Sequence, residues 1–155
     1  MSRQLTVIIV DDERLAREGL MLRLHGDVRF DVVAQCPSAH YALDAIEQFQ
    51  PDIAFVDIEM PGLSGLELAE LLSKNTTPVP KVVFVTAFRE FALSAFEFQA
   101  FDYLLKPFSD DRLANCLSKL VDSFSESDVV LQHLKLDELL SRKTCNSIDG
   151  FIRNL

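Results

Sequence analysis

Glycine and cysteine are scarce in this sequence, and both shortages limit what it can do. Only five of its 155 residues are glycine, and no segment resembles the glycine-rich loops that cradle the phosphates of a nucleotide. Its three cysteines, Cys36, Cys116 and Cys145, are odd in number, far apart and without the spacing of metal ligands. They are typical of reduced structural thiols, so we expect a cytoplasmic protein without cysteine-bound metal.

Positive charge is scarce as well. Fifteen Lys and Arg residues stand against 24 Asp and Glu residues, which gives a formal net charge of -9 and an isoelectric point near 4.7. Because phosphate contacts need clustered basic side chains, this chain is not expected to bind nucleic acid by itself. No apolar run approaches the roughly 20 residues of a membrane span. The N-terminus lacks a signal-peptide pattern, so no membrane association is expected.

The sequence does contain a regular alternation of apolar strands and amphipathic helices. Its length and its apolar content of 48% suit one domain with a proper core. Strands are predicted at residues 5–10, 30–36, 53–56, 81–85 and 102–105, each followed by a helical pattern; the fourth and fifth helices are expected at about 90–99 and 110–124. Five such units predict a three-layer, flavodoxin-like α/β fold, a doubly wound parallel sheet with strand order 2-1-3-4-5.

The segment Asp-Ile-Ala-Phe-Val-Asp-Ile-Glu-Met-Pro-Gly, residues 52–62, delivers one carboxylate to the end of a buried strand. Its apolar run stops at Asp57, and Met60-Pro61-Gly62 then turns the backbone. Ligands of open parallel sheets bind at the carboxyl ends of the strands, so Asp57 would lie at a binding edge. Taken alone, it is equally well explained as an Asp that opens a turn.

Three acidic residues, Asp11, Asp12 and Glu13, follow the first strand directly. Like charges this close repel one another, and hard cations such as Mg2+ prefer carboxylate oxygens. The cluster therefore predicts a magnesium site. An N-cap cluster is the alternative, because Asp favours the N-terminus of a helix, and both can hold together.

Two other strand ends carry polar side chains. Thr86 ends the fourth strand, where its hydroxyl can donate to an anion, and the small Ala87 leaves room beside it. Lys106 follows the fifth strand, and Pro107 stops that strand. Each has a simpler explanation, a β-forming threonine and a solvated lysine, but the predicted strand order brings both toward the acids.

Together these side chains suit Mg2+-assisted phosphoryl transfer onto a carboxylate. Asp57 is the best nucleophile and would form an acyl phosphate. Asp11 and Asp12 would hold Mg2+, while Lys106 and Thr86 would contact phosphoryl oxygens. Without a nucleotide cradle, the donor must arrive already activated.

About residues 5–123 resemble the receiver domain of two-component response regulators. The resemblance rests on four motifs at strand ends: Val10-Asp11-Asp12-Glu13, Asp57-Ile58-Glu59-Met60-Pro61-Gly62, Thr86-Ala87 and Lys106-Pro107-Phe108. It implies that Asp57 accepts phosphate from a phosphohistidine on a sensor histidine kinase. It also implies Mg2+ ligands from Asp12, Asp57 and the backbone carbonyl of Glu59, with Asp11 acting partly through water, and a cis peptide before Pro107.

The same resemblance implies a switch. Thr86 moves toward the phosphoryl group, Tyr103 turns inward, and the surface formed by the fourth helix, the fifth strand and the fifth helix changes state. Seven of the twelve phenylalanines fall between Phe84 and Phe108. An exposed remainder of these would suit homodimerisation through this surface.

Residues 95–108 resemble, more narrowly, receivers attached to LytTR-type DNA-binding domains. We therefore predict a receiver at residues 1–123 and, at 124–155, a helical extension or linker toward an absent output domain, through which alone DNA would be bound. Such a chain is not an enzyme in the ordinary sense, since it catalyses only its own phosphoryl transfer and dephosphorylation. Two alternatives stay open: a Mg2+-dependent phosphohydrolase that forms an aspartyl phosphate, with Glu59 as its second acid, and a degenerate receiver that only binds partners.

Overall fold

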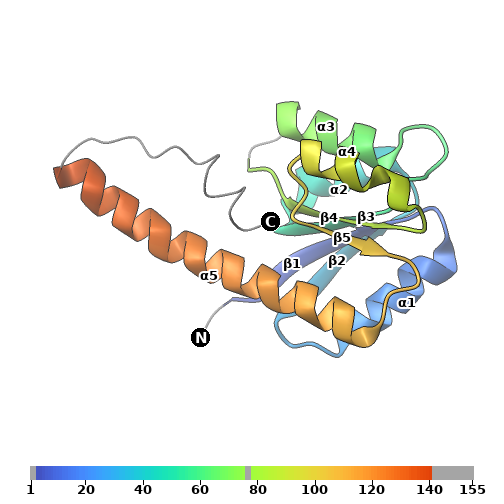
Figure 1. The fold of residues 1–155 in the computed structure, drawn as a ribbon, viewed down its shortest axis with the longest axis horizontal. Helices are drawn as coiled ribbons and strands as arrows, with labels where there is room; N and C mark the ends of the chain where they lie inside the picture. Colours follow the sequence, from blue (N-terminus) through green and yellow to red (C-terminus); the bar gives the residue numbers. More distant parts are fainter. Residues whose placement is uncertain (1–2, 76–77, 141–155) are drawn as a thin grey trace. The chain divides into compact units, whose positions relative to one another are not determined.

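The fold is built on a parallel sheet of five strands (Figure 1). The computed structural model describes residues 3–75 and 78–140, with side chains as far as residue 125. The strands lie in the order β2-β1-β3-β4-β5. Their bounds are β1 Leu5–Val10, β2 Phe30–Cys36, β3 Ile53–Val56, β4 Lys81–Thr86 and β5 Asp102–Leu105. The predicted α/β sheet and its 2-1-3-4-5 order are confirmed.

Helices cover both faces of this sheet. They are α1 Arg14–His25, α2 Ala39–Phe49, α3 Gly65–Asn75, the short 3-10 helix η1 Arg89–Phe91, α4 Ala92–Glu97 and α5 Asp110–Leu140. Figure 1 shows α2, α3 and α4 on one face, with α1 and the first turns of α5 on the other, which makes the predicted three layers. No helix in the described part of the chain is both long and apolar enough to cross a membrane.

The chain forms two compact units, Met1–Cys116 and Leu117–Leu155. α5 contributes to both, since it begins at Asp110 and is described as far as Leu140. The division at residue 123, with 124–155 as a linker toward an output domain, stays a prediction. Its last part, residues 141–155, lies outside the described residues.

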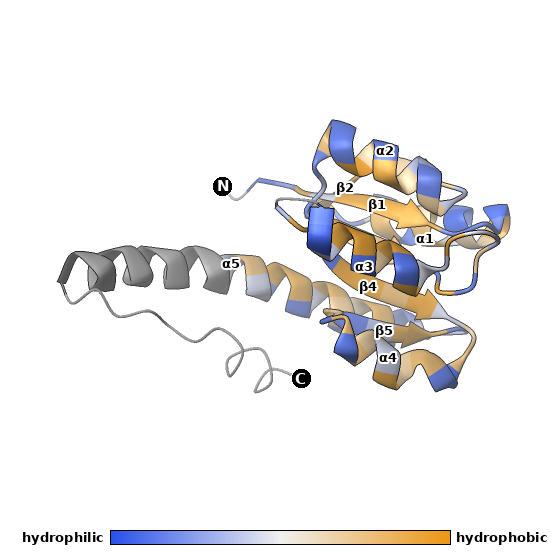
Figure 2. Cartoon of the chain, turned by 90° about the horizontal axis from the view of Figure 1, so that it is seen from above, coloured by the Kyte–Doolittle hydropathy of each residue, from blue (hydrophilic) through white to orange (hydrophobic). Residues whose placement is uncertain are grey.

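The central strands are mostly apolar, and β3 entirely so, because helices cover both of their faces. β3 is buried at all four positions and β1 at five of six. Figure 2 shows β1 and β4, on either side of β3 in the sheet, in the colour of hydrophobic residues. Phe55 of β3 and Phe84 of β4 are among the largest fully buried side chains. Each such phenylalanine contributes about 1.5–3 kcal/mol by leaving water, so the strands that carry the site are firmly held.

Serine side chains cap the N-termini of two helices. The Ser38 hydroxyl accepts a hydrogen bond from the Tyr41 N–H at 3.2 Å. Ser64 and Glu67 form a reciprocal capping box: the Glu67 N–H donates to Ser64 Oγ at 3.1 Å, and the Ser64 N–H donates to Glu67 Oε1 at 3.2 Å. This cap fixes where α3 begins, eight residues after the start of the turn that follows β3.

The fourth helix is shorter than its predicted range of 90–99. The chain first makes the 3-10 helix η1, and α4 itself has six residues, of which only Ala95 is buried. Leu93 and Phe96 are 73% and 46% exposed. A helix of fewer than two turns has room for only about one residue that faces the sheet fully. The apolar pattern of this segment therefore lies largely at the surface.

Candidate phosphoacceptor and metal site

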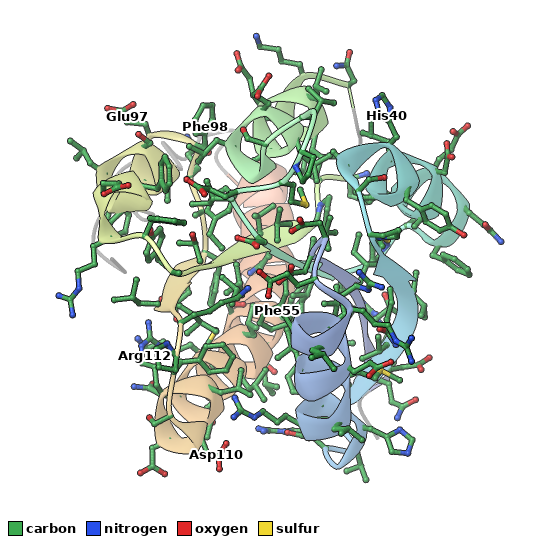
Figure 3. All side chains as sticks on the ribbon, turned by 90° about the vertical axis from the view of Figure 1, so that its right-hand side faces the viewer. His40, Phe55, Glu97, Phe98, Asp110 and Arg112 are labelled. Atoms are coloured by element: carbon green, nitrogen blue, oxygen red, sulfur yellow. The ribbon has the colours of Figure 1, made fainter. Side chains whose placement is uncertain are left out.

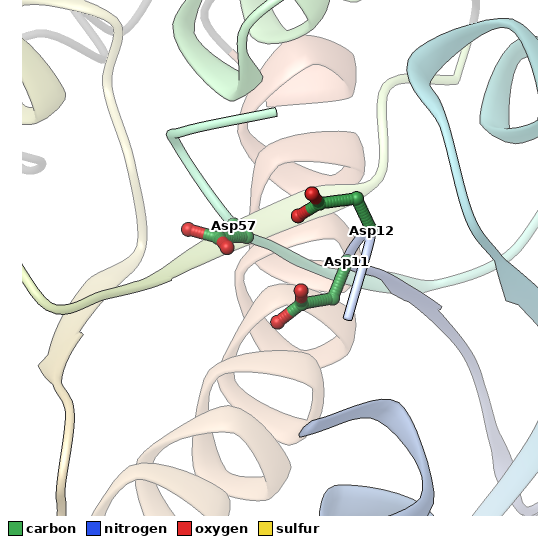
Figure 4. Close-up of side chains that lie close together, drawn as sticks. All are labelled: Asp11, Asp12 and Asp57. Carbon is green, nitrogen blue, oxygen red and sulfur yellow. The ribbon is translucent and has the colours of Figure 1, made fainter. Parts of the chain in front are cut away.

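The site lies at the carboxyl-terminal edge of the sheet, where β1 and β3 end as neighbours. Val10 stands opposite Val56 in the parallel register, and the Asp57 N–H donates to the Val10 carbonyl at 2.8 Å. Asp11 follows β1 and Asp57 follows β3, so this register places the two aspartates side by side. One carboxylate oxygen from each of Asp11, Asp12 and Asp57 lies within 4.8 Å of the others, and Figure 4 shows the three side chains converging.

Asp57 is the buried member at the end of β3, with a side chain only 10% exposed. The Glu59 N–H donates to its Oδ1 at 3.3 Å, and the Lys106 ammonium lies 3.6 Å from its Oδ2. Burial raises the pKa of Asp57 to about 6, an effect that the charge of Lys106 opposes and that of Asp11 reinforces. At neutral pH this carboxyl group is ionised and poorly solvated, which suits a nucleophile.

Lys106 bridges two of the three carboxylates. Its Nζ donates to Asp11 Oδ2 at 2.8 Å while lying near Asp57 Oδ2. Burial disfavours its charge, but the hydrogen bond to Asp11 and the negative charges of Asp57 and Asp11 outweigh that effect, and the pKa of Lys106 is raised. The ammonium therefore stays charged and offsets part of the repulsion among the acids. The peptide before Pro107 is cis, as the resemblance implied.

The three carboxylates form a donor set that fits a magnesium ion. Mg2+ takes hard oxygen ligands and is usually held by one or two carboxylates together with water and phosphate oxygens. Asp12 is the exposed member of the cluster, so an ion can reach it from solvent. Glu59 is exposed too, in the loop after Asp57 whose carbonyl the resemblance named as a ligand.

The loop after Asp57 depends on a glycine that sequence reasoning overlooked. Gly65 begins α3, and its N–H donates to the Ile58 carbonyl at 2.8 Å. A Cβ at this position would lie 2.3 Å from the Asp57 carbonyl oxygen and 2.9 Å from Ile58 Cα. Backbone packs directly on backbone here. The sequence around Gly65 gives no sign of this contact, because the backbone that it touches belongs to Asp57 and Ile58, eight and seven residues earlier.

Thr86 and Tyr103 are connected through the segment after β4. Thr86 is fully buried, and its Oγ accepts a hydrogen bond from the Phe88 N–H at 3.3 Å. The Tyr103 hydroxyl donates to the carbonyl of the same residue, Phe88. The Thr86 carbonyl accepts from the Lys106 N–H at 2.8 Å, which ties the ends of β4 and β5 together. The two predicted switch residues thus contact opposite sides of one residue.

Figure 3 shows side chains on the helices around the site, among them Arg112 on α5 and His40 on α2. Arg112, at the start of α5, holds β5 by donating to the two carboxylate oxygens of Asp102 at 2.8 and 3.1 Å. His40 lies on the outer side of α2, and both it and His25 are exposed.

Comparison with known proteins places this geometry in a family. A model of the response regulator receiver domain matches residues 7–118. An uncharacterized response regulatory protein of Yersinia pestis is 52% identical over 116 residues, which are 75% of this chain and 48% of that protein. Transcriptional regulatory protein BtsR of Escherichia coli is 44% identical over 125 residues, 81% of this chain and 52% of that protein. The chain thus spans about half the length of these relatives.

Solved structures give the same result. The response regulatory domain of protein MrkE from Klebsiella pneumoniae matches with a TM-score of 0.74 at 35% identity, covering 79% of this chain and 99% of that one. Response regulator TrrA from Thermotoga maritima, solved in complex with Mg(2+)-BeF, matches with a TM-score of 0.66 at 30% identity, covering 76% and 99%. The chain belongs to the response regulator receiver domains of two-component signalling, and is a signalling domain of that family rather than a classical enzyme.

Proposed function

We propose that this chain is a phosphorylation-driven switch in which Asp57 accepts a phosphoryl group from a phosphohistidine of a sensor histidine kinase in the cytoplasm. The observation that carries the proposal is the placement of Asp57. It is buried, ionised at neutral pH, next to two further carboxylates and 3.6 Å from a lysine ammonium. A nucleophilic carboxylate with its own counter-charge suits transfer from a donor that is already activated.

The transfer step needs little from the protein beyond position and charge. A carboxylate oxygen of Asp57 attacks phosphorus, the P–N bond of the phosphohistidine breaks, and its electron pair stays on the imidazole nitrogen. Lys106 pairs with one phosphoryl oxygen, and the Thr86 hydroxyl donates to another. Asp11, Asp12, Asp57 and the Glu59 carbonyl are the proposed Mg2+ ligands, and the bound ion would neutralise phosphoryl oxygens.

Output follows from the hydroxyl of Thr86. When it turns to the phosphoryl group, the Phe88 N–H loses its present acceptor, and the Tyr103 hydroxyl carries the change to β5. We propose that the surface of α4, β5 and the start of α5 then favours homodimerisation. The exposed side chains of Leu93 and Phe96 on α4 support this surface as an interface.

The output domain is proposed to be of the LytTR type and to bind DNA, with residues 124–155 leading toward it. Two observations support a regulatory output: the sequence of residues 95–108, and relatives named transcriptional regulatory proteins that match this chain over only about half of their own length. Residues 3–75 and 78–140 carry no such domain themselves.

The proposed chemistry is tested by intact mass after incubation with acetyl phosphate. The chain should gain one phosphoryl group with Mg2+ and none in excess chelator, and Asp57→Asn should gain none. Modification of the Asp57→Asn variant to the same extent, or equal modification without metal, would refute the assigned site. Repeated turnover of a small phosphate ester would favour the phosphohydrolase alternative instead.

A further inference from the structure

We propose that Arg17 is a positioning residue for the metal site. Its guanidinium holds the peptide group that joins Asp11 to Asp12, and in this way directs the Asp12 carboxylate. The inference rests on the proposed binding of Mg2+ by Asp11, Asp12 and Asp57. It concerns a residue of α1 that no motif of the phosphorylation site includes.

The contact itself is short and well placed. Arg17 Nη1 donates to the Asp11 carbonyl at 2.7 Å. Every other polar atom of Asp11 also has a partner: its N–H donates to the Cys36 carbonyl at 3.0 Å, Oδ1 accepts from the Glu13 N–H at 2.9 Å, and Oδ2 accepts from Lys106 Nζ at 2.8 Å. Of these contacts, only the one from Arg17 fixes the carbonyl on the Asp12 side.

Asp12 depends on that peptide because its own side chain is exposed at the rim of the cluster. Rotation of the Asp11–Asp12 peptide would turn the Asp12 carboxylate away from Asp57 while leaving the Asp11 carboxylate bonded to Lys106. In metal sites, residues that hydrogen-bond to the ligands fix the orientation of side chains that would otherwise be free to turn away from the metal.

An unpaired nitrogen of Arg17 indicates that its bond to the Asp11 carbonyl serves more than the stability of the fold. Within residues 3–75 and 78–125, the only buried side-chain nitrogen or oxygen atom without a hydrogen-bond partner is Arg17 Nε. An unpaired buried donor costs free energy, and an apolar side chain of similar length would avoid that cost. Arg17 therefore leaves its Nε unpaired, while its Nη1 donates to the Asp11 carbonyl.

Positioning and charge predict opposite effects when Arg17 is neutralised. A positive charge bonded to Asp11 competes with a divalent cation, so its removal alone should tighten Mg2+ binding. Loss of the bond to the Asp11 carbonyl should instead weaken Mg2+ binding, because the Asp12 carboxylate is no longer directed. The sign of the change therefore separates the two roles.

The experiment is calorimetric titration of Mg2+ into wild type, Arg17→Met, Arg17→Lys and the control Arg14→Met. Arg14 lies on the same helix, is 79% exposed and pairs with Glu18 at 2.8 Å, so its variant makes the same charge change without removing the bond to the Asp11 carbonyl. Arg17→Met should weaken Mg2+ binding about tenfold, as loss of such partners does in other metal sites. Arg17→Lys should lie between Arg17→Met and wild type, and Arg14→Met should bind like wild type.

Phosphorylation by acetyl phosphate gives a second reading of the same variants. In Arg17→Met the Mg2+ concentration for half-maximal rate should rise by the factor found in calorimetry, while the rate at saturating Mg2+ should stay near that of wild type. Mg2+ binding to Arg17→Met that equals or exceeds that of Arg14→Met would overturn the proposal. If Arg17→Met does not fold, an Arg17→Lys dissociation constant equal to that of wild type would overturn it. A wild-type chain that binds no Mg2+ would refute the metal site itself.

Discussion

The Asp57 carboxylate is ionised at the expense of stability, because it is buried beside two other acids. Its pKa in the folded chain is about 6, against an ordinary value of 3.8. The folded state therefore holds this proton more tightly than the unfolded state. The stabilisation that comes from this tighter proton binding is fully present below about pH 3.8 and is lost as the pH rises through about 6.

Asp57→Asn should therefore stabilise the metal-free chain at neutral pH. At pH 7.5 in chelator we expect a gain of about 1–3 kcal/mol in the free energy of unfolding, which disappears toward pH 4. Urea unfolding of both proteins from pH 4 to 8 measures it. The exposed Asp44→Asn on α2 is the control and should change stability by less than about 0.5 kcal/mol. An Asp57→Asn chain no more stable than wild type at pH 7.5 would contradict the assigned burial.

Gly65 should tolerate no side chain, because a Cβ would meet the Asp57 backbone at 2.3 Å. Gly65→Ala is expected to lower stability by about 1–3 kcal/mol and to slow phosphorylation, since the backbone of Asp57 must shift to make room. Gly19→Ala on α1, where nothing lies within 4 Å of the added Cβ, should instead stabilise by about 0.5–1 kcal/mol. Thermal unfolding and acetyl phosphate kinetics compare the pair, and equal behaviour of the two variants would refute the close contact.

At the scale of elements, the two hydrogen bonds at Phe88 join the segment that leads into η1 to the end of β4 and to β5. Tyr103→Phe removes the hydroxyl that donates to the Phe88 carbonyl but keeps the ring that packs against the core. Phosphorylation of Asp57 should proceed at nearly the wild-type rate, because Tyr103 is not in contact with the carboxylates. The structural change in α4 that follows phosphorylation should be smaller than in wild type.

Nuclear magnetic resonance of backbone amides in residues 88–97, with and without the phosphoryl analogue beryllofluoride, measures that response. Wild type should show large shifts there, and Tyr103→Phe markedly smaller ones. Shifts of the same size in both proteins would mean that Tyr103 does not couple the phosphorylation site to α4.

How much the sequence could predict also differs by element. The five strands and the acids at their ends were predictable because a continuous apolar run that stops at a charged residue locates both a buried strand and its edge. Periodicity was a poorer guide to helices: the range 90–99 was predicted as one helix, and the chain divides it between the 3-10 helix η1 and a six-residue α4. The contacts of Gly65 and Arg17 were not predictable, since each depends on backbone from another element.

At the scale of the whole molecule, the prediction concerns self-association. Leu93 on α4 and Leu22 on α1 are almost equally exposed, at 73% and 74%, which makes them a matched pair. Phosphorylated wild type should sediment as a dimer, Leu93→Ser as a monomer, and Leu22→Ser as wild type, because only Leu93 lies on the proposed interface. Dimerisation that is lost in Leu22→Ser but kept in Leu93→Ser would place the interface on α1 instead.

The central claim is that Asp57 carries the phosphoryl group, and chemical trapping tests it most directly. The chain is phosphorylated with acetyl phosphate and Mg2+, then treated with borohydride, which reduces an acyl phosphate to an alcohol and turns the modified aspartate into homoserine. Peptide mass spectrometry should find homoserine at position 57 alone, and none when Mg2+ is left out. Homoserine at position 11 or 12, or unmodified peptide 52–62 in a chain that has gained phosphate, would contradict the account.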